Sequence, residues 1–147
     1  MNCLECNTEL DRSERTYSME TLGISLCNAH IDRIEKIIKT KHTPLEAVQL
    51  YYALKKAGLH PTLEWWDGRR SIDIAISRVK LNIEIESNYE TISHEQAIKD
   101  LEEAMLSFKN GFTTIRIPDV LVKYHLKDTV KNLTGIVEGL KINLKAI

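Results

Sequence analysis

Hydrophobic and polar positions follow two different periods along the chain. Apolar residues recur at helical spacing and predict helices over residues 28–38, 43–58, 93–110, 119–124 and 129–141. Polar and apolar residues alternate in segments that predict strands over residues 62–66, 71–76, 80–86 and 112–117. A looser alternation from Thr16 to Leu26 predicts a β-hairpin. Helices interspersed with strands in this order predict an α/β protein.

Four of the predicted helices begin with capping signals. Thr43 lies three residues before Glu46, which predicts a capping box at the start of the helix over residues 43–58. Ser93 and Gln96 have the same spacing and predict a second capping box. Two aspartates are predicted to cap the helices near the C-terminus, Asp119 and Asp128.

The composition narrows the class of protein. Of the 147 residues, 43% are hydrophobic and 28% are charged, which is ordinary for a soluble globular protein and excludes a disordered tail or a collagen-like fibre. Apolar runs stay short of the roughly 18–20 residues that cross a membrane, and the N-terminus lacks a secretory signal pattern. We therefore expect a cytoplasmic protein with no membrane partner. A net charge of −1 provides no basic field that would indicate nucleic acid by itself.

The cysteines and one histidine are spaced like the ligands of a metal ion. Cys3 and Cys6 form a C-x-x-C pair, Cys27 and His30 form a C-x-x-H pair, and these four residues include every cysteine of the chain. Four soft ligands make the closed tetrahedral shell of a structural zinc site, whereas a catalytic zinc would keep an open position. A redox-active C-x-x-C pair is the alternative, but no βαβ pattern follows it. The prediction is a structural zinc ion.

A metal would also explain how the N-terminal segment becomes ordered. Residues 1–30 contain few large apolar side chains, so burial alone would not order them, and a bound zinc ion would supply the missing stability. A knuckle, a hairpin and a helix whose first turn carries the second ligand pair together resemble a treble-clef zinc finger. The predicted organisation is a finger with a linking helix over residues 1–42, followed by an α/β domain over residues 43–147.

Alternation within the predicted strands gathers acidic residues on one face. In the strand over 71–76, Asp73 points away from the isoleucines of the core, and in the strand over 80–86, Lys80, Glu84 and Glu86 share one face. If these two strands form a hairpin, Asp73 lies near Glu84 and Glu86. A divalent cation such as Mg²⁺ or Mn²⁺ would relieve the repulsion between the three carboxylates. The alternative is an ordinary solvated sheet face.

The order of these elements resembles the PD-(D/E)xK nuclease superfamily, in particular the small endonuclease domains related to very-short-patch mismatch repair. The resemblance covers roughly residues 43–122, and its anchors are Glu46, Asp73, residues 81–86, Asp100 and residues 111–117. It implies a restriction-endonuclease-like core, which is a mixed sheet flanked by helices, and Mg²⁺-dependent hydrolysis of DNA phosphodiester bonds. It further implies that Asp73 and Glu84 hold the catalytic metal.

The catalytic details of the resemblance leave alternatives open. Glu86 occupies the third motif position, where relatives often carry Asp or Lys, and Lys80 is the candidate for the assisting lysine. We expect a DNA endonuclease, with a non-cleaving nucleic-acid-binding module and a protein-interaction module on the same scaffold as alternatives. The sequence predicts DNA as the partner and does not predict an oligomeric state.

Overall fold

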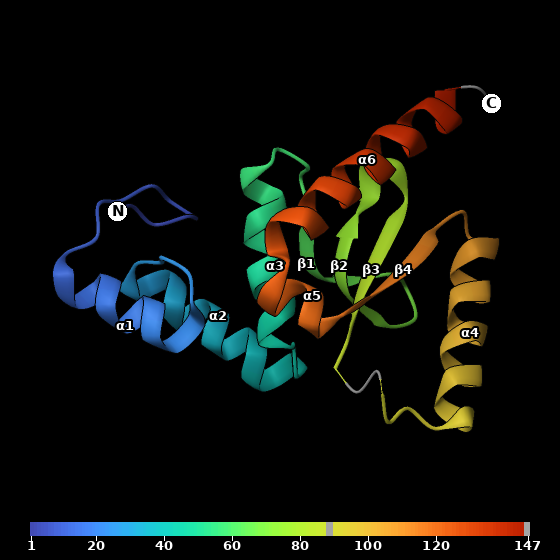
Figure 1. Ribbon diagram of the computed structural model, residues 1–147, viewed down its shortest axis with the longest axis horizontal. Helices are drawn as coiled ribbons and strands as arrows, with labels where there is room; N and C mark the ends of the chain where they lie inside the picture. Colours follow the sequence, from blue (N-terminus) through green and yellow to red (C-terminus); the bar gives the residue numbers. More distant parts are fainter. Residues whose placement is uncertain (88–89, 146–147) are drawn as a thin grey trace.

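The structure is a computed structural model that describes residues 1–87 and 90–145 (Figure 1). The helices are α1 (Arg12–Leu22), α2 (Asn28–Lys41), α3 (Leu45–Lys56), α4 (His94–Lys109), α5 (Asp119–Tyr124) and α6 (Leu126–Lys145), with a 3-10 turn, η1, at Ser77–Val79. The strands are β1 (Thr62–Trp66), β2 (Ser71–Ile76), β3 (Leu81–Glu86) and β4 (Thr113–Pro118). None of the helices within the described part of the chain is long and apolar enough to cross a membrane.

The four strands form one mixed sheet in the order β1-β2-β3-β4. Strands β1, β2 and β3 pair antiparallel with one another. Strand β4 pairs parallel to β3, because α4 carries the chain back across the sheet between them. The α/β class and the four predicted strands are confirmed, each to within one residue at either end. The structure does not decide whether this mixed sheet is a restriction-endonuclease-like core, which therefore remains a prediction.

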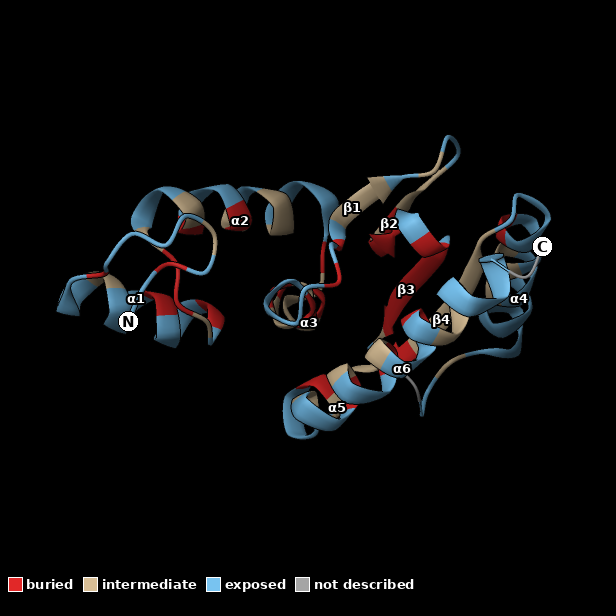
Figure 2. Ribbon diagram, turned by 90° about the horizontal axis from the view of Figure 1, so that it is seen from above, coloured by how far each residue is buried: buried red, intermediate tan, exposed pale blue. Residues whose placement is uncertain are grey.

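The main hydrophobic core lies on the face of the sheet that α3, α5 and α6 cover (Figure 2). The alternation of β2 and β3 places their aliphatic side chains on this face, and most of them are fully buried: Ile74, Ile76, Leu81, Ile83 and Ile85. Leu50 and Leu54 of α3 and Leu133 and Val137 of α6 pack against them. These helices cover one face of the sheet. Because side chains alternate along a strand, the intervening polar side chains of β2 and β3 point to the opposite face.

Helix α4 lies on that opposite face and contacts β4 (Figures 1 and 2). The side of α4 that faces the sheet is polar, with Ser107 buried and Asp100 and Glu103 partly buried. Three buried side-chain atoms between α4 and the sheet have no hydrogen-bond partner within the described residues, namely Asn82 Oδ1, Ser107 Oγ and Thr114 Oγ1. The interface between α4 and the sheet is therefore polar and incompletely satisfied, unlike the apolar layer behind the sheet.

The N-terminal segment differs from its prediction. The hairpin expected over Thr16–Leu26 is wrong, because α1 occupies most of this segment. The Asp11 side chain accepts a hydrogen bond from the Glu14 N–H at 2.8 Å and the Glu14 side chain binds back to the Asp11 N–H, which makes a capping box. Gly23 ends the helix in the left-handed region at φ 71°. These start and stop signals outweigh the loose alternation between them.

The capping predictions elsewhere have mixed outcomes. The Thr43 hydroxyl donates to Glu64 rather than capping α3, whose N-cap is Pro44, so that capping box is wrong. The Ser93 hydroxyl does accept the Gln96 N–H at 3.1 Å, but the Gln96 side chain reaches forward to Asp100. The two C-terminal aspartates fall inside the first turns of α5 and α6 instead of capping them.

A second, smaller core joins the N-terminal segment to α3. Leu22, Leu26 and Ile31 from the α1–α2 region pack with Val48 and Tyr52 of α3. A salt bridge of 2.7 Å between Glu5 and Lys55 links the knuckle loop to the same helix. The boundary predicted between residues 42 and 43 thus crosses a packed interface, because one face of α3 contacts the sheet and another contacts the finger.

Candidate functional site

The predicted zinc ligands converge at the N-terminal end of α2. An isolated β-bridge between Asn2 and Glu9 closes the knuckle that carries Cys3 and Cys6, while Cys27 is the N-cap of α2 and His30 lies in its first turn. Local signals therefore position all four ligands: a tight turn at the first pair, closed by the Asn7 N–H on the Cys3 carbonyl, and a helix start at the second.

The four ligand atoms lie within 4.8 Å of one another. His30 Nδ1 is 3.1 Å from the Cys27 sulfur and 3.6 Å from the Cys3 sulfur, and the Cys6 and Cys27 sulfurs are 3.9 Å apart. Tetrahedral sulfur and nitrogen ligands of one zinc ion lie roughly 3.4–3.8 Å apart. The cluster is thus compatible with zinc, and among the described residues it is the one group of three or more His, Cys, Asp or Glu that could hold a metal ion.

Thr8 supports this cluster in a way that the ligand spacing did not reveal. Its hydroxyl lies 3.1 Å from the Cys6 sulfur, and together with its backbone N–H it lowers the pKa of the Cys6 thiol to about 6. Burial has the opposite effect on Cys27 and raises the pKa of its thiol. Hydrogen bonds to a cysteine favour the thiolate, which is the form that binds metal.

Asp73 and Glu84 lie at facing positions of β2 and β3, on the sheet face that α4 covers. Glu84 is buried, and its Oε2 lies 3.5 Å from the Asp73 backbone nitrogen. The Asp73 Oδ2 accepts a hydrogen bond of 2.9 Å from the Ile85 N–H. Strand pairing and alternation thus bring these two carboxylates together, as the hairpin hypothesis required.

The surroundings of Asp73, Glu84 among them, favour the protonated form of its carboxyl group. Burial, followed by the nearby negative charge of Glu84, raises the pKa of Asp73 to about 7, and the Ile85 N–H offsets part of this rise. Folding therefore makes this carboxyl group a weaker acid than an exposed aspartate. A carboxylic acid whose pKa lies near 7 beside a second carboxylate is a group that could exchange its proton for a cation.

Arg70, in the turn between β1 and β2, contacts Glu84 from the side. Its Nη1 donates to Glu84 Oε1 at 2.7 Å, and its Nε lies 3.0 Å from Glu103 of α4. Both Nε and the remaining nitrogen, Nη2, are buried, and neither has a hydrogen-bond partner among the residues that the structure describes. Asp67 shapes the turn by accepting the Arg69 and Arg70 N–H groups at 2.7 Å each, and these bonds lower its pKa against the effect of burial.

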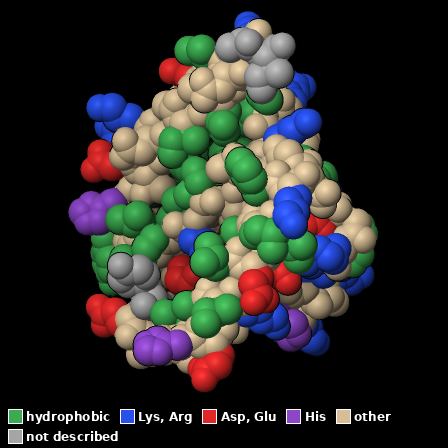
Figure 3. All heavy atoms as spheres, turned by 90° about the vertical axis from the view of Figure 1, so that its right-hand side faces the viewer, with side chains coloured by type: hydrophobic (Ala, Val, Ile, Leu, Met, Phe, Trp, Pro, Cys, Tyr) green, Lys and Arg blue, Asp and Glu red, His purple; other side chains and the backbone are tan. Residues whose placement is uncertain are grey.

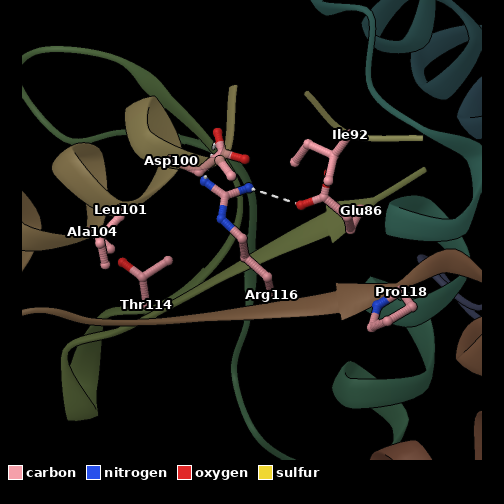
Figure 4. A pocket seen from close by; sticks show the side chains of 9 residues that line it. Glu86, Ile92, Asp100, Leu101, Ala104, Thr114, Arg116 and Pro118 are labelled. Carbon is pink, nitrogen blue, oxygen red and sulfur yellow. Dashed lines mark hydrogen bonds and ion pairs between the residues drawn. The ribbon is translucent and has the colours of Figure 1, made fainter. Parts of the chain in front are cut away.

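Glu86, the third predicted carboxylate, faces a second arginine instead of the Asp73–Glu84 pair. Arg116 of β4 lies 3.4 Å from Glu86 and 3.5 Å from Asp100 of α4 (Figure 4). These three side chains border a cavity of about 460 Å³ between β4 and α4, whose walls are otherwise mostly apolar, with Ile92, Leu101 and Pro118. The three carboxylates consequently do not form one compact ligand group within the described residues.

Two further residues singled out in the sequence lie elsewhere. Lys80 is exposed at the turn before β3, with its side chain beside Gly111. Three strand residues lie between it and Glu84, and the four residue steps correspond to about 13 Å. Glu46 lies 3.4 Å from Lys123 of α5. The structure therefore does not bring Lys80 or Glu46 to the carboxylate pair.

Sequence reasoning missed the two arginines, although one signal was available. Arg70 stands in the Asp67-Gly68-Arg69-Arg70 turn of a predicted hairpin, directly before the strand that carries Asp73. A basic residue at that position is close to the acidic face in any hairpin of this length. No comparable local signal assigns Arg116 to Glu86.

Neither models of protein families, nor curated proteins, nor solved structures give a match to this chain. The functional interpretation accordingly depends on the geometry of the two clusters.

Proposed function

We propose that this protein is a metal-dependent phosphodiester hydrolase acting on DNA, with Asp73 and Glu84 as ligands of a Mg²⁺ or Mn²⁺ ion. The observation that carries the proposal is the carboxylate pair: a buried glutamate, Glu84, and a partly buried aspartate, Asp73, on neighbouring strands, with the pKa of Asp73 raised to about 7. Strongly shifted carboxyl pKa values are concentrated at functional sites. The succession of elements from α3 to β4 supports the nuclease class, because the resemblance rests on the same order.

The donor chemistry of the pair fits a hard divalent cation. Mg²⁺ prefers oxygen ligands and is commonly held by one or two carboxylates, with water and substrate phosphate in its other positions. Two carboxylates therefore suffice, even though Glu86 is engaged with Arg116. When bound, such an ion would neutralise charge on the phosphate and ionise a water molecule.

The residues of the chain have separate roles in this proposal. Asp73 and Glu84 bind the cation, and the Ile85 N–H fixes the orientation of the Asp73 carboxylate. Arg70 orients Glu84 and takes the part for which the sequence suggested Lys80, since its buried Nη2 lacks a partner among the described residues. A phosphate oxygen would satisfy that nitrogen. Glu86 holds Arg116 at the cavity beside the pair.

We propose a structural role for the second cluster, with zinc bound by Cys3, Cys6, Cys27 and His30. The four ligand atoms are close enough together to surround one ion, and they leave no position for a substrate. This zinc would order the finger that packs on α3.

Metal titration and DNA nicking test the hydrolase proposal together. We expect calorimetry to detect Mg²⁺ or Mn²⁺ binding to the wild-type protein, and supercoiled plasmid to be nicked when either ion is present. Asp73→Asn and Glu84→Gln should lose both properties, whereas Glu20→Gln, which removes an exposed acid of α1, should retain them. Thermal unfolding checks that each variant folds. Nicking at the same rate by wild type and Asp73→Asn would refute the proposal.

A non-cleaving nucleic-acid-binding module is the second candidate function. The observation that favours it is that Glu84 and Glu86 are each paired with an arginine, an arrangement that is complete without a metal ion. This candidate predicts DNA binding that weakens steeply with salt, with no dependence on Mg²⁺ and no nicking. The titration described above distinguishes the two functions.

A further inference from the structure

Beside its polar side that meets the arginines, α4 carries four large exposed apolar residues, one of which, Leu101, also borders the cavity between α4 and β4. Ile98, Leu101, Met105 and Phe108 are 59%, 71%, 43% and 69% exposed, and we refer to them as the α4 stripe. Hydrophobic side chains gather on the side of the molecule to which α4 belongs (Figure 3). The intervals of three, four and three residues place all four on one narrow strip of the helix surface.

This orientation reverses the usual one for a helix that packs on a sheet. The residues of α4 that face the sheet are polar, including Asp100, Glu103 and Ser107, and they meet the arginines of the carboxylate face. The α4 stripe therefore contributes little to the core of its own chain. Contiguous apolar surface of this kind on a soluble protein marks an interaction site.

We propose that the α4 stripe is a homodimer interface, in which α4 pairs antiparallel with α4 of a second copy of this chain. Spacing of three and four residues is the pattern with which two helices interlock side chains in a coiled coil. In the antiparallel register that aligns all four residues, Ile98 meets Phe108 of the partner subunit and Leu101 meets Met105 of the partner subunit. A two-fold axis generates both halves of this contact, so one surface is complementary to itself.

The charges beside the α4 stripe support the antiparallel arrangement. Glu95, Glu102 and Lys109 follow one edge of the stripe at intervals of seven residues, and Ala97 and Ala104 follow the other. In the antiparallel pair, Glu95 lies across from Lys109 of the partner subunit, and symmetry makes this attraction twice. A parallel pair would instead set the charged edge of each helix against the alanine edge of the other.

The area is sufficient for a weak specific dimer. Large side chains exposed to this degree present on the order of 400–500 Å² of apolar surface per copy, since each carries about 150–250 Å² when fully exposed. Together with the flanking residues, a symmetric pair would cover on the order of 1,000 Å² in total, the lower limit for a specific interface. We therefore expect a dissociation constant in the micromolar range.

Sedimentation velocity of the full chain over a concentration series tests this proposal. Wild type should shift from monomer to dimer, and Leu101→Glu or Phe108→Glu should raise the dissociation constant roughly tenfold to hundredfold. Both positions are mostly exposed in the monomer, so the variants should unfold at the wild-type temperature. Ile142→Glu is the matched control, because Ile142 is 68% exposed on α6, away from the stripe. It should dimerise like wild type.

Charge reversal tests the direction of the pair. Glu95→Lys should weaken the dimer about tenfold, because each of two attractions becomes a repulsion, and adding Lys109→Glu should restore wild-type affinity. Glu102 lies near the two-fold axis against its own copy, so Glu102→Gln should strengthen the dimer a few-fold. A monomeric wild type at all concentrations, or a dimer indifferent to Leu101→Glu, would overturn the proposed interface. A failure of the double reversal to restore binding would overturn the antiparallel register.

Discussion

Arg70 joins Glu84 of β3 to Glu103 of α4: its Nη1 lies 2.7 Å from the Glu84 carboxylate and its Nε lies 3.0 Å from the Glu103 carboxylate. Arg116 repeats the arrangement two residues further along β3, where it joins Glu86 to Asp100 of α4. The two acidic positions on α4 are one helical turn apart, which matches the two same-face positions on the strand. Ion pairs rather than apolar packing thus attach α4 to the sheet.

Replacing Arg70 should weaken the attachment of α4 to the sheet and change how the Asp73–Glu84 pair binds Mg²⁺. Arg70→Gln leaves Glu84 buried without its ion-pair partner, so we expect a loss of about 1–3 kcal/mol in the free energy of unfolding. Because the arginine competes with a cation for Glu84, Mg²⁺ should bind the variant several-fold more tightly, while plasmid nicking should fall. Urea unfolding and calorimetry measure the two effects.

Lys80→Ala is the comparison for Arg70→Gln. Lys80 is exposed and distant from the carboxylates, so removing its side chain should change neither Mg²⁺ affinity nor nicking. Its backbone has a left-handed φ of 54° with lysine already in place, so alanine can occupy the same conformation. If Lys80→Ala abolished nicking while Arg70→Gln did not, the roles that we assign to these two cations would be reversed.

The raised pKa of Asp73 predicts a specific pH dependence of stability. Because its pKa is about 7 in the folded protein and about 3.9 in an unfolded chain, folding favours the protonated form. The stability that this group contributes is complete below about pH 4 and is lost as the pH rises to about 7. The loss amounts to about 2–4 kcal/mol, on the scale of 1.36 kcal/mol per pKa unit.

Asp73→Asn tests this dependence, because an amide keeps an oxygen acceptor for the Ile85 N–H and does not ionise. Without Mg²⁺, the variant should gain stability relative to wild type as the pH rises from about 5 to about 8. Urea unfolding at each pH measures the difference, and Glu20→Gln is the control. Stability curves of wild type and Asp73→Asn that stay parallel over this range would contradict the assignment.

The sequence predicted the elements whose signals are local. Strand alternation defined β1 to β4 and predicted that Asp73 and Glu84 share one face, as they do, because the partner of β2 is the next strand along the chain. The metal-ligand spacing predicted the Cys3–Cys6–Cys27–His30 cluster for the same reason, since each pair lies within one turn.

Features that depend on contacts across space were not predictable. The capping signal at Ser93 identified α4 as a helix, but it could not indicate that the polar side of α4 faces the sheet, because Arg70 and Arg116 approach it from a turn and from another strand. The weak alternation around Tyr17 predicted a hairpin where α1 forms, because that prediction took no account of the Asp11–Glu14 capping box at the start of the helix. Helix ends were a stronger signal there than the internal pattern.

Removal of zinc should unfold the finger and destabilise α3 with it. The cysteine and histidine ligands supplement the small apolar core through which the N-terminal segment packs on α3, so a chelator should release this segment and expose Val48 and Tyr52, which it covers. We expect lower helical content by circular dichroism and a lower unfolding temperature, both restored by zinc. Cys27→Ser should reproduce the chelated state without chelator.

Val48→Ala separates this coupling from a general loss of stability. Val48 is fully buried in the small core between the finger and α3, so its truncation should cost about 1–3 kcal/mol and should also weaken zinc binding, since metal affinity and folding of the finger are linked. Leu133→Ala, in the main core on the other side of α3, should cost more in the free energy of unfolding and leave zinc affinity unchanged. Competition with a chromogenic chelator measures the affinity. Equal zinc affinity in Val48→Ala and wild type would mean that the finger folds independently of α3.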